Sequence, residues 1–333
     1  MRRKALIVAA MAVASVLGLQ AAQASDLVLN SLQSQANVGY GYTNTGAYSS
    51  TSPRSGLYFL YRDGGVDKIQ DAVQQTYFYR VGASGTANEI NSGTSASLLS
   101  SSGSMGATQY TDNNGQFSVK IGYVLTGSGI AGFTNNLGRQ ILISNTTASP
   151  LTMSFWSYSD YTLTGVSSTK PTPGNPYQDN NGAPTVANNG YEFAQVKSAG
   201  TVTQWDTYGS PTGPHISDLS NNYGGLYSTG SSVGSPTIQL GLGGGSNVSG
   251  TILDKLVNNN PDLTASGIGS QVGGQGAGGI ATDVAFAAQW NLTIPAGGYA
   301  YLTESTAVVP EPASLALLGL GASLLVWPRR RRA

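Results

Sequence analysis

The residue types that most often carry catalysis are scarce in this chain of 333 residues, which has no cysteine and one histidine. The absence of cysteine excludes thiolate metal sites, disulfides and a cysteine nucleophile. His215 is followed by Asp218, and residues 230–234 have the Gly-x-Ser-x-Gly letters of a nucleophile elbow. No strand pattern precedes those letters and no helical pattern follows them. We therefore interpret His215 as a loop residue and predict no catalytic residue there.

Carboxylates are the second candidate chemistry, because a glycoside hydrolase needs two of them on facing elements. Three glutamates lie between the two ends of the chain: Glu89, Glu192 and Glu304. Nothing in their sequence surroundings indicates a raised pKa, and no pattern selects a pair. A secreted glycoside hydrolase is therefore kept only as the less favoured alternative.

Calcium is a third possibility, because residues 112–115 and 179–182 both read Asp-Asn-Asn-Gly. Asp and Asn oxygens are ligands for hard cations, but the same letters are typical of hairpin turns. Neither copy continues to the glutamate of an EF-hand loop. Residues 273–278 resemble a calcium-binding nonapeptide, but Gly278 stands where an aspartate is needed. We predict turns and no metal site.

Glycine-rich letters of the dinucleotide-binding type occur twice, at Gly127, Gly129 and Gly132 and again at Gly274, Gly276 and Gly279. Neither copy opens a helical pattern, so neither offers a helix N-terminus to a phosphate. With 45 glycines in the chain, chance matches are expected. We predict no cofactor.

Tyrosine is abundant, with 18 residues, and many lie among Gly, Ser, Asn and Thr. Aromatic faces beside amide and hydroxyl groups suit sugar rings, although strand packing explains tyrosines equally well. The candidates are Tyr40, Tyr42, Tyr48, Tyr158, Tyr161, Tyr208, Tyr223 and Tyr227. They make a carbohydrate-binding module the main alternative function.

The elements that would position these residues are predicted to be strands. In residues 283–294 every even position is apolar, and residues 116–125 repeat the same period of two, as residues 151–156 do more briefly. Asn-Gly pairs supply turn chemistry. The pattern predicts an all-β fold, an antiparallel, jelly-roll-like β-sandwich with long Gly/Asn/Ser-rich loops and one buried face per sheet.

Helical signals are few. Residues 66–73 fit one helical face, and residues 251–257 could form two turns. Residues 166–190, 211–236 and 267–279 are rich in loop formers. We predict one domain over residues 25–307, with a two-domain split near 166–190 as the alternative.

The N-terminus has the order of a secretory signal peptide. Basic residues at 2–4 precede an uncharged apolar run at 5–19, and Ala22 and Ala24 form the small-x-small cleavage site. Residues 1–24 are therefore predicted to form a signal helix that is removed after Ala24.

The C-terminus has the features of a second targeting signal. Pro310, Glu311 and Pro312 precede an uncharged apolar run at 313–327, and Arg329, Arg330, Arg331 and Arg332 follow. At 1.5 Å per residue the run is roughly 22 Å long, short for a membrane span, but the arginines would hold its C-terminal end in the cytoplasm. We predict a transmembrane helix over 313–327. A plain tail anchor is the alternative.

This order of Pro-Glu-Pro, short apolar run and arginine cluster in residues 308–333 resembles the PEP-CTERM sorting signal of Gram-negative bacteria. The resemblance implies recognition by exosortase, a membrane transpeptidase, with processing near Pro310–Pro312. It also implies a link to exopolysaccharide or biofilm. Shorter stretches resemble bodies of such proteins, whose function is unassigned: residues 79–82, 145–147, 158–161 and 289–298.

Between its two ends the chain keeps 9 basic and 15 acidic residues, a net charge of about −6. Such a mildly acidic, sparsely charged surface excludes a nucleic-acid partner. We predict a non-enzymatic protein that passes transiently through the inner membrane and is then retained at the cell surface or in the extracellular matrix. Its predicted partners are exosortase and exopolysaccharide.

Overall fold

The computed structural model of the protein describes residues 25–31, 34–40, 56–63, 66–126, 135–160, 191–198, 200–207, 216–227, 233, 235–243, 250–258, 261–273 and 284–310. The predicted signal helix at 1–24 and the predicted transmembrane helix at 313–327 lie outside these residues. Among the residues described, no helix is long and apolar enough to cross a membrane.

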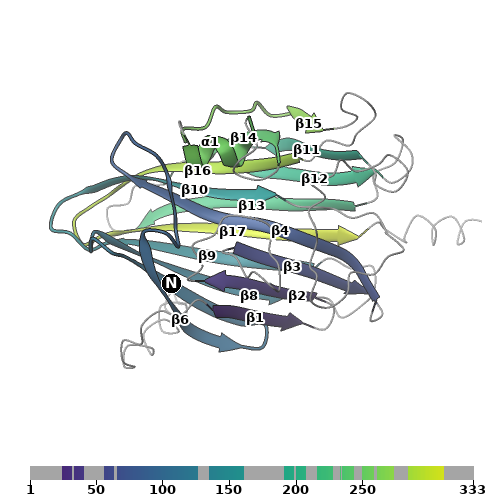
Figure 1. Cartoon of the computed structure of the whole chain (residues 1–333), viewed down its shortest axis with the longest axis horizontal. Coiled ribbons are helices and arrows are strands. Elements are labelled where there is room, and N and C mark those ends of the chain that lie inside the picture. Colours follow the sequence, from purple (N-terminus) through teal and green to yellow (C-terminus); the bar gives the residue numbers. More distant parts are fainter. Residues whose placement is uncertain are drawn as a thin grey trace, which may run out of the picture.

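Within this part of the chain, strands account for nearly all regular structure, and they form two antiparallel sheets packed face to face (Figure 1). The elements are β1 Ser25–Ser31, β2 Ser34–Tyr40, β3 Gly56–Asp63, β4 Val66–Val81, β5 Asn88–Glu89, β6 Thr94–Ser102, β7 Met105–Asp112, β8 Phe117–Thr126, β9 Asn135–Asn145, β10 Leu151–Asp160, β11 Tyr191–Ser198, β12 Thr201–Thr207, β13 Ile216–Tyr227, β14 Thr237–Leu242, α1 Ile252–Asn258, β15 Gln271–Gly273, β16 Val284–Ile294 and β17 Tyr299–Pro310.

One sheet has the order β1-β2-β3-β4-β10-β16-β14, with β5 added beside β4, and the other has the order β15-β11-β12-β13-β17-β9-β8-β7-β6. The predicted sandwich of antiparallel sheets is therefore confirmed. Together the two sheets have more than the eight strands of a jelly roll. Most strands pair with their neighbours in sequence, in three meanders: β1–β4, β6–β9 and β11–β13. The chain crosses repeatedly between the sheets. As a result β9, which precedes the segment 166–190 in sequence, pairs with β17, which follows it.

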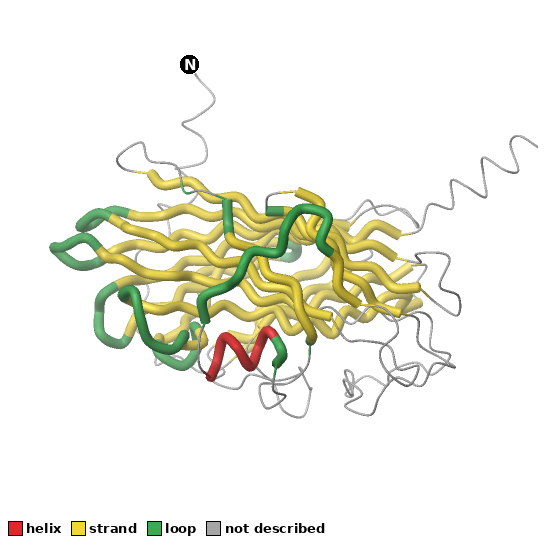
Figure 2. Tube along the Cα trace, turned by 90° about the horizontal axis from the view of Figure 1, so that it is seen from above, coloured by secondary structure: helices red, strands yellow, loops and turns green. Residues whose placement is uncertain are grey.

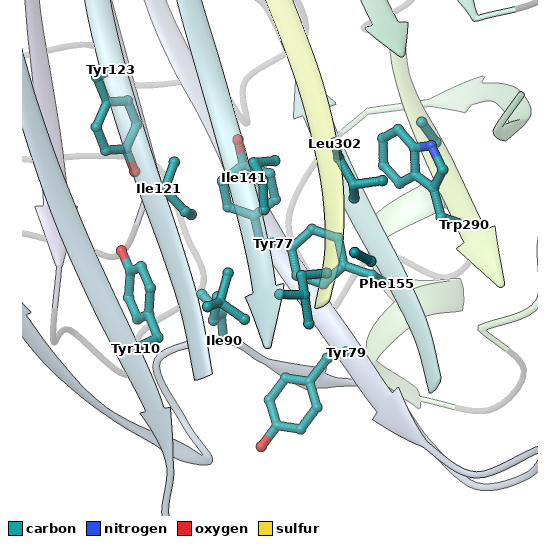
Figure 3. Packing of buried hydrophobic residues seen from close by; sticks show 14 of the residues in the cluster. Tyr77, Tyr79, Ile90, Tyr110, Ile121, Tyr123, Ile141, Phe155, Trp290 and Leu302 are labelled. Carbon is teal, nitrogen blue, oxygen red and sulfur yellow. The ribbon is translucent and has the colours of Figure 1, made fainter. Parts of the chain in front are cut away.

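The core lies between the sheets and draws residues from Leu27 to Leu302. The predicted alternation is confirmed in β8, where Phe117, Val119 and Ile121 are fully buried. Aromatic rings fill the centre (Figure 3). Tyr77 stacks on Phe155 with ring centroids 5.5 Å apart, and Tyr79 meets Phe117 edge-on at 4.8 Å. Such geometries stabilise aromatic pairs beyond simple burial.

The outer face of β10 and β16 is buried as well, which corrects the expectation of one buried face per sheet. The helix α1 packs its residues Ile252, Leu253 and Leu256 in one apolar cluster with four side chains of the sheet, Trp156, Tyr158, Ala285 and Ala287. Figure 2 shows the helix against the outside of the strands. A small third layer therefore covers this part of the sheet.

The helix predicted at 251–257 is confirmed as α1. Thr251 caps it, because its Oγ1 accepts a hydrogen bond from the Asp254 backbone N–H at 3.1 Å. The Asp254 carboxylate accepts in turn from the N–H of Gly250, the residue before the cap, at 3.2 Å.

The helical face predicted for residues 66–73 is wrong, because they form the first half of β4. That half pairs with β3 from Asp63↔Val66 to Leu57↔Gln75. The second half pairs with β10. Pairing with the adjacent strand β3 therefore overrides a local period of 3.6 that few residues support.

Candidate functional site

Strand β17 links the interior of the sandwich to the C-terminal tail. It lies between β13 and β9, and its register runs from Tyr227↔Tyr299 to Ile216↔Pro310 on one side and from Tyr299↔Ser144 to Val308↔Asn135 on the other. The strand is therefore paired on both edges along almost its whole length.

The predicted sorting residues begin where β17 ends. Pro310 is its last residue, so the strand extends three residues beyond the predicted boundary at 307. Glu311, Pro312 and the arginines at 329–332 lie outside the described residues, as do Ala22 and Ala24. At the other end of the chain, β1 begins at Ser25, the first residue after the predicted cleavage.

Near its middle, β17 contributes the carboxylate of Glu304 to a polar centre inside the sandwich. Glu304 Oε2 lies 3.5 Å from Arg139 Nε of β9, and neither side chain is exposed. The Tyr77 hydroxyl of β4, in the opposite sheet, donates to the same oxygen at 2.7 Å. Arg139 Nη2 also donates to Thr306 Oγ1 at 2.7 Å. The centre therefore joins both sheets across the apolar core.

Tyrosine hydroxyls continue this polar centre, which comprises Arg139, Glu304 and Tyr77. Burial raises the pKa of Tyr77 well above its ordinary value, and the negative charge of Glu304 raises it further. Burial likewise raises the pKa of Tyr123 to about 12. Figure 3 shows the Tyr110 and Tyr123 hydroxyls pointing toward one another. These phenols stay protonated at physiological pH and act as hydrogen-bond donors.

A cavity of about 20 Å³ lies beside the polar centre, lined by Gln75, Tyr77, Asn91, Tyr110 and Tyr123 among others. Gln75 is 2% exposed, and its Nε2 donates to Ser157 Oγ at 3.3 Å. A volume of this size admits a water molecule but no sugar ring.

Glu89 is a second buried carboxyl, in β5 at the edge of β4. Its pKa is raised to about 8 because burial disfavours the charged form. The sequence surroundings of Glu89 give no indication of this shift, because the burial that causes it comes from the fold. Both Glu89 and Glu304 are buried, so neither offers a carboxylate to a substrate at the surface.

A second arginine–carboxylate pair holds the third layer on the outer face of the sheet. Arg80 of β4 donates to both carboxylate oxygens of Asp262, at 2.8 and 3.3 Å. Its guanidinium carbon lies 5.4 Å from the centre of the Trp156 ring. Gln289 Nε2 also donates to Asp262 Oδ1, and its Oε1 accepts from the Leu263 N–H. These contacts are structural, and they attach the segment after α1 to the sheet.

The turn interpretation of residues 112–115 is confirmed. The Asp112 carboxylate accepts from the Gln116 N–H at 2.9 Å, and the Gly115 N–H donates to the Asp112 carbonyl. Gly115 has φ of +70°, which a side chain disfavours. Among the described residues, no three His, Cys, Asp or Glu side chains are grouped to hold a metal ion.

The remaining sequence candidates fall into two groups. Of the tyrosines proposed to contact sugars, Tyr40 and Tyr158 are buried, which excludes both as surface platforms, and Tyr223 and Tyr227 lie in β13. Outside the described residues lie His215, Tyr42, Tyr48, Tyr161, Tyr208, the second Asp-Asn-Asn-Gly copy and the dinucleotide-type glycines. Glu192 lies in β11, and Asp218 lies in β13 opposite Val308.

Comparison with known proteins identifies the end of the chain, where residues 308–332 match the model of the PEP-CTERM protein-sorting motif. The chain ends in a PEP-CTERM sorting motif. This motif implies an exported protein associated with the membrane or the cell surface and processed by exosortase. Its first three residues are the last three of β17.

No curated protein matches the chain. Solved structures similar to it include a bacterial glucoamylase in complex with acarbose, at 9% identity and a TM-score of 0.40, covering 92% of this chain and 36% of the glucoamylase. A provisionally assigned kojibiose phosphorylase from the human microbiome gives 10% identity and a TM-score of 0.36, covering 89% of this chain and 32% of its own. This chain thus spans about a third of their length, and neither activity is carried over.

The buried polar centre was missed from sequence, although a signal existed. In β9 the inward positions are Leu137, Arg139, Ile141 and Ile143, so an arginine occupies an apolar position of the alternation. Glu304 follows buried Ala300 and Leu302 in β17 in the same way. Two opposite charges at inward positions of two strands indicate a buried pair.

Proposed function

We propose that this protein is a non-enzymatic surface protein whose β-sandwich is carried by the PEP-CTERM motif to the cell surface or extracellular matrix. There it makes structural or adhesive contacts with exopolysaccharide. The observation that carries the proposal is the continuity of β17 with the motif, since Val308–Pro310 belong to both. Anchoring and processing at the motif therefore act directly next to a strand that is paired on both edges within the sandwich.

The roles of the glutamates support a non-enzymatic function. Glu304 is held by Arg139 and Tyr77 inside the core, and Glu89, in the short strand β5 beside β4, is 7% exposed. A glycoside hydrolase needs two carboxylates that reach a sugar. Both of these carboxylates serve the interior instead.

The proposal is tested by replacing Pro310, Glu311 and Pro312 with alanine in the full chain. The apolar run at 313–327 and the arginines are unchanged, so the variant should stay in the membrane as unprocessed precursor. Immunoblotting of membrane and surface fractions measures this. Alanines at Arg329–Arg332 should instead let some uncut chain escape to the periplasm, because they weaken the stop signal.

Processing of the triple-alanine variant like the wild type would contradict the proposal and favour a plain tail anchor. The adhesive part is tested separately by imaging the tagged protein in cells with and without exopolysaccharide synthesis. Equal retention in both would remove exopolysaccharide as the partner.

A further inference from the structure

The connection between the sandwich and the membrane segment has almost no slack. Twelve residue pairs fix β17 to β13 and ten fix it to β9, up to Pro310. Only Glu311 and Pro312 then precede the apolar run that begins at Ala313. Three Cα steps span at most about 11 Å, and the two prolines restrict the backbone further.

That distance is comparable to the thickness of the lipid headgroup layer, which is roughly 6 Å on each side of the hydrocarbon core. β17 is paired on both edges and so is fixed in direction within its sheet. In a precursor anchored by residues 313–327, the end of the sandwich that contains Pro310 would then lie at the membrane surface. The strands beside it place Thr126, the last residue of β8, and Asn135, the first of β9, at this same end. We call it the tail end.

The opposite end of the sandwich, which we call the turn end, is closed by hydrogen bonds between the turns at 112–116, 145–149 and 295–298. The Asn145 N–H donates to the Gly298 carbonyl at 2.9 Å, and the Thr146 N–H donates to the Gln116 carbonyl at 3.0 Å. The Asn145 side-chain amide donates to the carbonyls of Ser149, Ile294 and Pro295.

The two ends are well separated. Eleven steps of β17, at about 3.3 Å each, place Tyr299 roughly 36 Å from Pro310. Figure 1 shows the β17 arrow running along the long axis of the sandwich, and Figure 2 shows described turns gathered at the other end.

We propose that in the membrane-anchored precursor the tail end lies against the lipid headgroups and the turn end points away from the membrane. This inference rests on the proposed function, because it requires that residues 313–327 anchor the precursor. Its consequence is that the turn end and the outer strand faces are presented to the surroundings, while the tail end faces lipid.

The absence of cysteine allows a direct test with single cysteines in the full chain. Thr126→Cys places a thiol at the tail end, and Ala296→Cys places one at the turn end; both native residues are exposed. Each precursor is reconstituted in phosphatidylethanolamine/phosphatidylglycerol vesicles and treated with a bulky maleimide–polyethylene glycol. We expect the tail-end thiol to react at least several-fold more slowly than the turn-end thiol.

The matched control inserts a flexible Gly/Ser linker of about 20 residues after Pro310, which gives a reach of about 25 Å. Freed from the membrane, the tail-end thiol should then react as fast as the turn-end thiol. Equal rates without the linker, or a slow tail-end thiol that the linker does not relieve, would overturn the inference. Failure of the chain to float with the vesicles would instead contradict the anchor and hence the proposed function.

Discussion

Two arginine–carboxylate pairs occur at different depths of this sandwich. Arg139 and Glu304 lie between the sheets, with both side chains fully buried and 3.5 Å between Arg139 Nε and Glu304 Oε2. Arg80 and Asp262 lie on the outer face, joined by two hydrogen bonds, and the Asp262 side chain is 51% exposed. The better geometry therefore belongs to the more exposed pair.

The difference in burial gives the two pairs different effects on stability. A buried pair loses hydration that its attraction only partly replaces, so its net contribution is small, but breaking it leaves an uncompensated buried charge. An exposed pair is screened by water and contributes little. The inner pair thus joins two neighbouring strands of one sheet, β9 and β17, and reaches the other sheet through Tyr77. The outer pair fixes where the third layer attaches.

The largest expected effect comes from breaking the inner pair. Glu304→Gln leaves the Arg139 charge in the core, and we expect the free energy of unfolding to fall by about 3–5 kcal/mol. Urea denaturation measures it.

Replacing both members, with Arg139→Met and Glu304→Met, should recover most of that loss, because no charge stays buried. If the double variant had a lower free energy of unfolding than Glu304→Gln, the pair would be a net stabiliser of the fold.

Glu89 sharpens the comparison, because it is a buried carboxyl for which no arginine contact is seen among the described residues. Its pKa is about 8 in the folded protein, against an ordinary value of 4.5. Between these values the folded state retains a proton that the unfolded state releases, so stability falls as pH rises, by about 1.4 kcal/mol per pH unit at most. Below pH 4.5 and above pH 8 this contribution is constant.

Glu89→Gln should remove that slope and stabilise the protein by a few kcal/mol at pH 8. Thermal denaturation over pH 4–9 checks it, with Asn88→Ser, at the exposed neighbour, as the control. An unchanged slope would mean that the carboxyl is hydrated or paired in solution.

The smallest effect is expected at the outer pair, where Asp262→Asn should lower stability by about 1 kcal/mol or less. The loss should be local, with faster hydrogen exchange of α1 amides and unchanged exchange in β8 and β9. Hydrogen bonding from Arg80 lowers the pKa of Asp262. The contribution of the pair is thus present at neutral pH and disappears only in acid, as the carboxylate protonates. Global loss of protection would show that the third layer supports the whole fold.

The strands could be predicted where one local pattern sufficed, as in residues 116–125 and 283–294. The same patterns could not show that Ala285 and Ala287 are buried on the second face, because the helix that covers them is more than 25 residues away in sequence. Residues 66–73 failed for a different reason, since their pairing with the adjacent strand β3 outweighs the helical period of a few side chains.

The C-terminal end of the chain could be interpreted directly from sequence, because a sorting signal is an ordered string of residue types. The PEP-CTERM motif was recognised from that order alone. The polar centre was not, because Arg139 and Glu304 are 165 positions apart and become partners only when β9 and β17 align.

The pairing of β17 on both edges also has a mechanical consequence. A pull on the tail acts along this strand, while its hydrogen bonds to β13 and β9 run across it. Such a load is shared by both rows of bonds at once, whereas peeling an edge strand would break them one after another. A force applied through the tail of the anchored precursor would therefore be borne by a strand that is held on both sides.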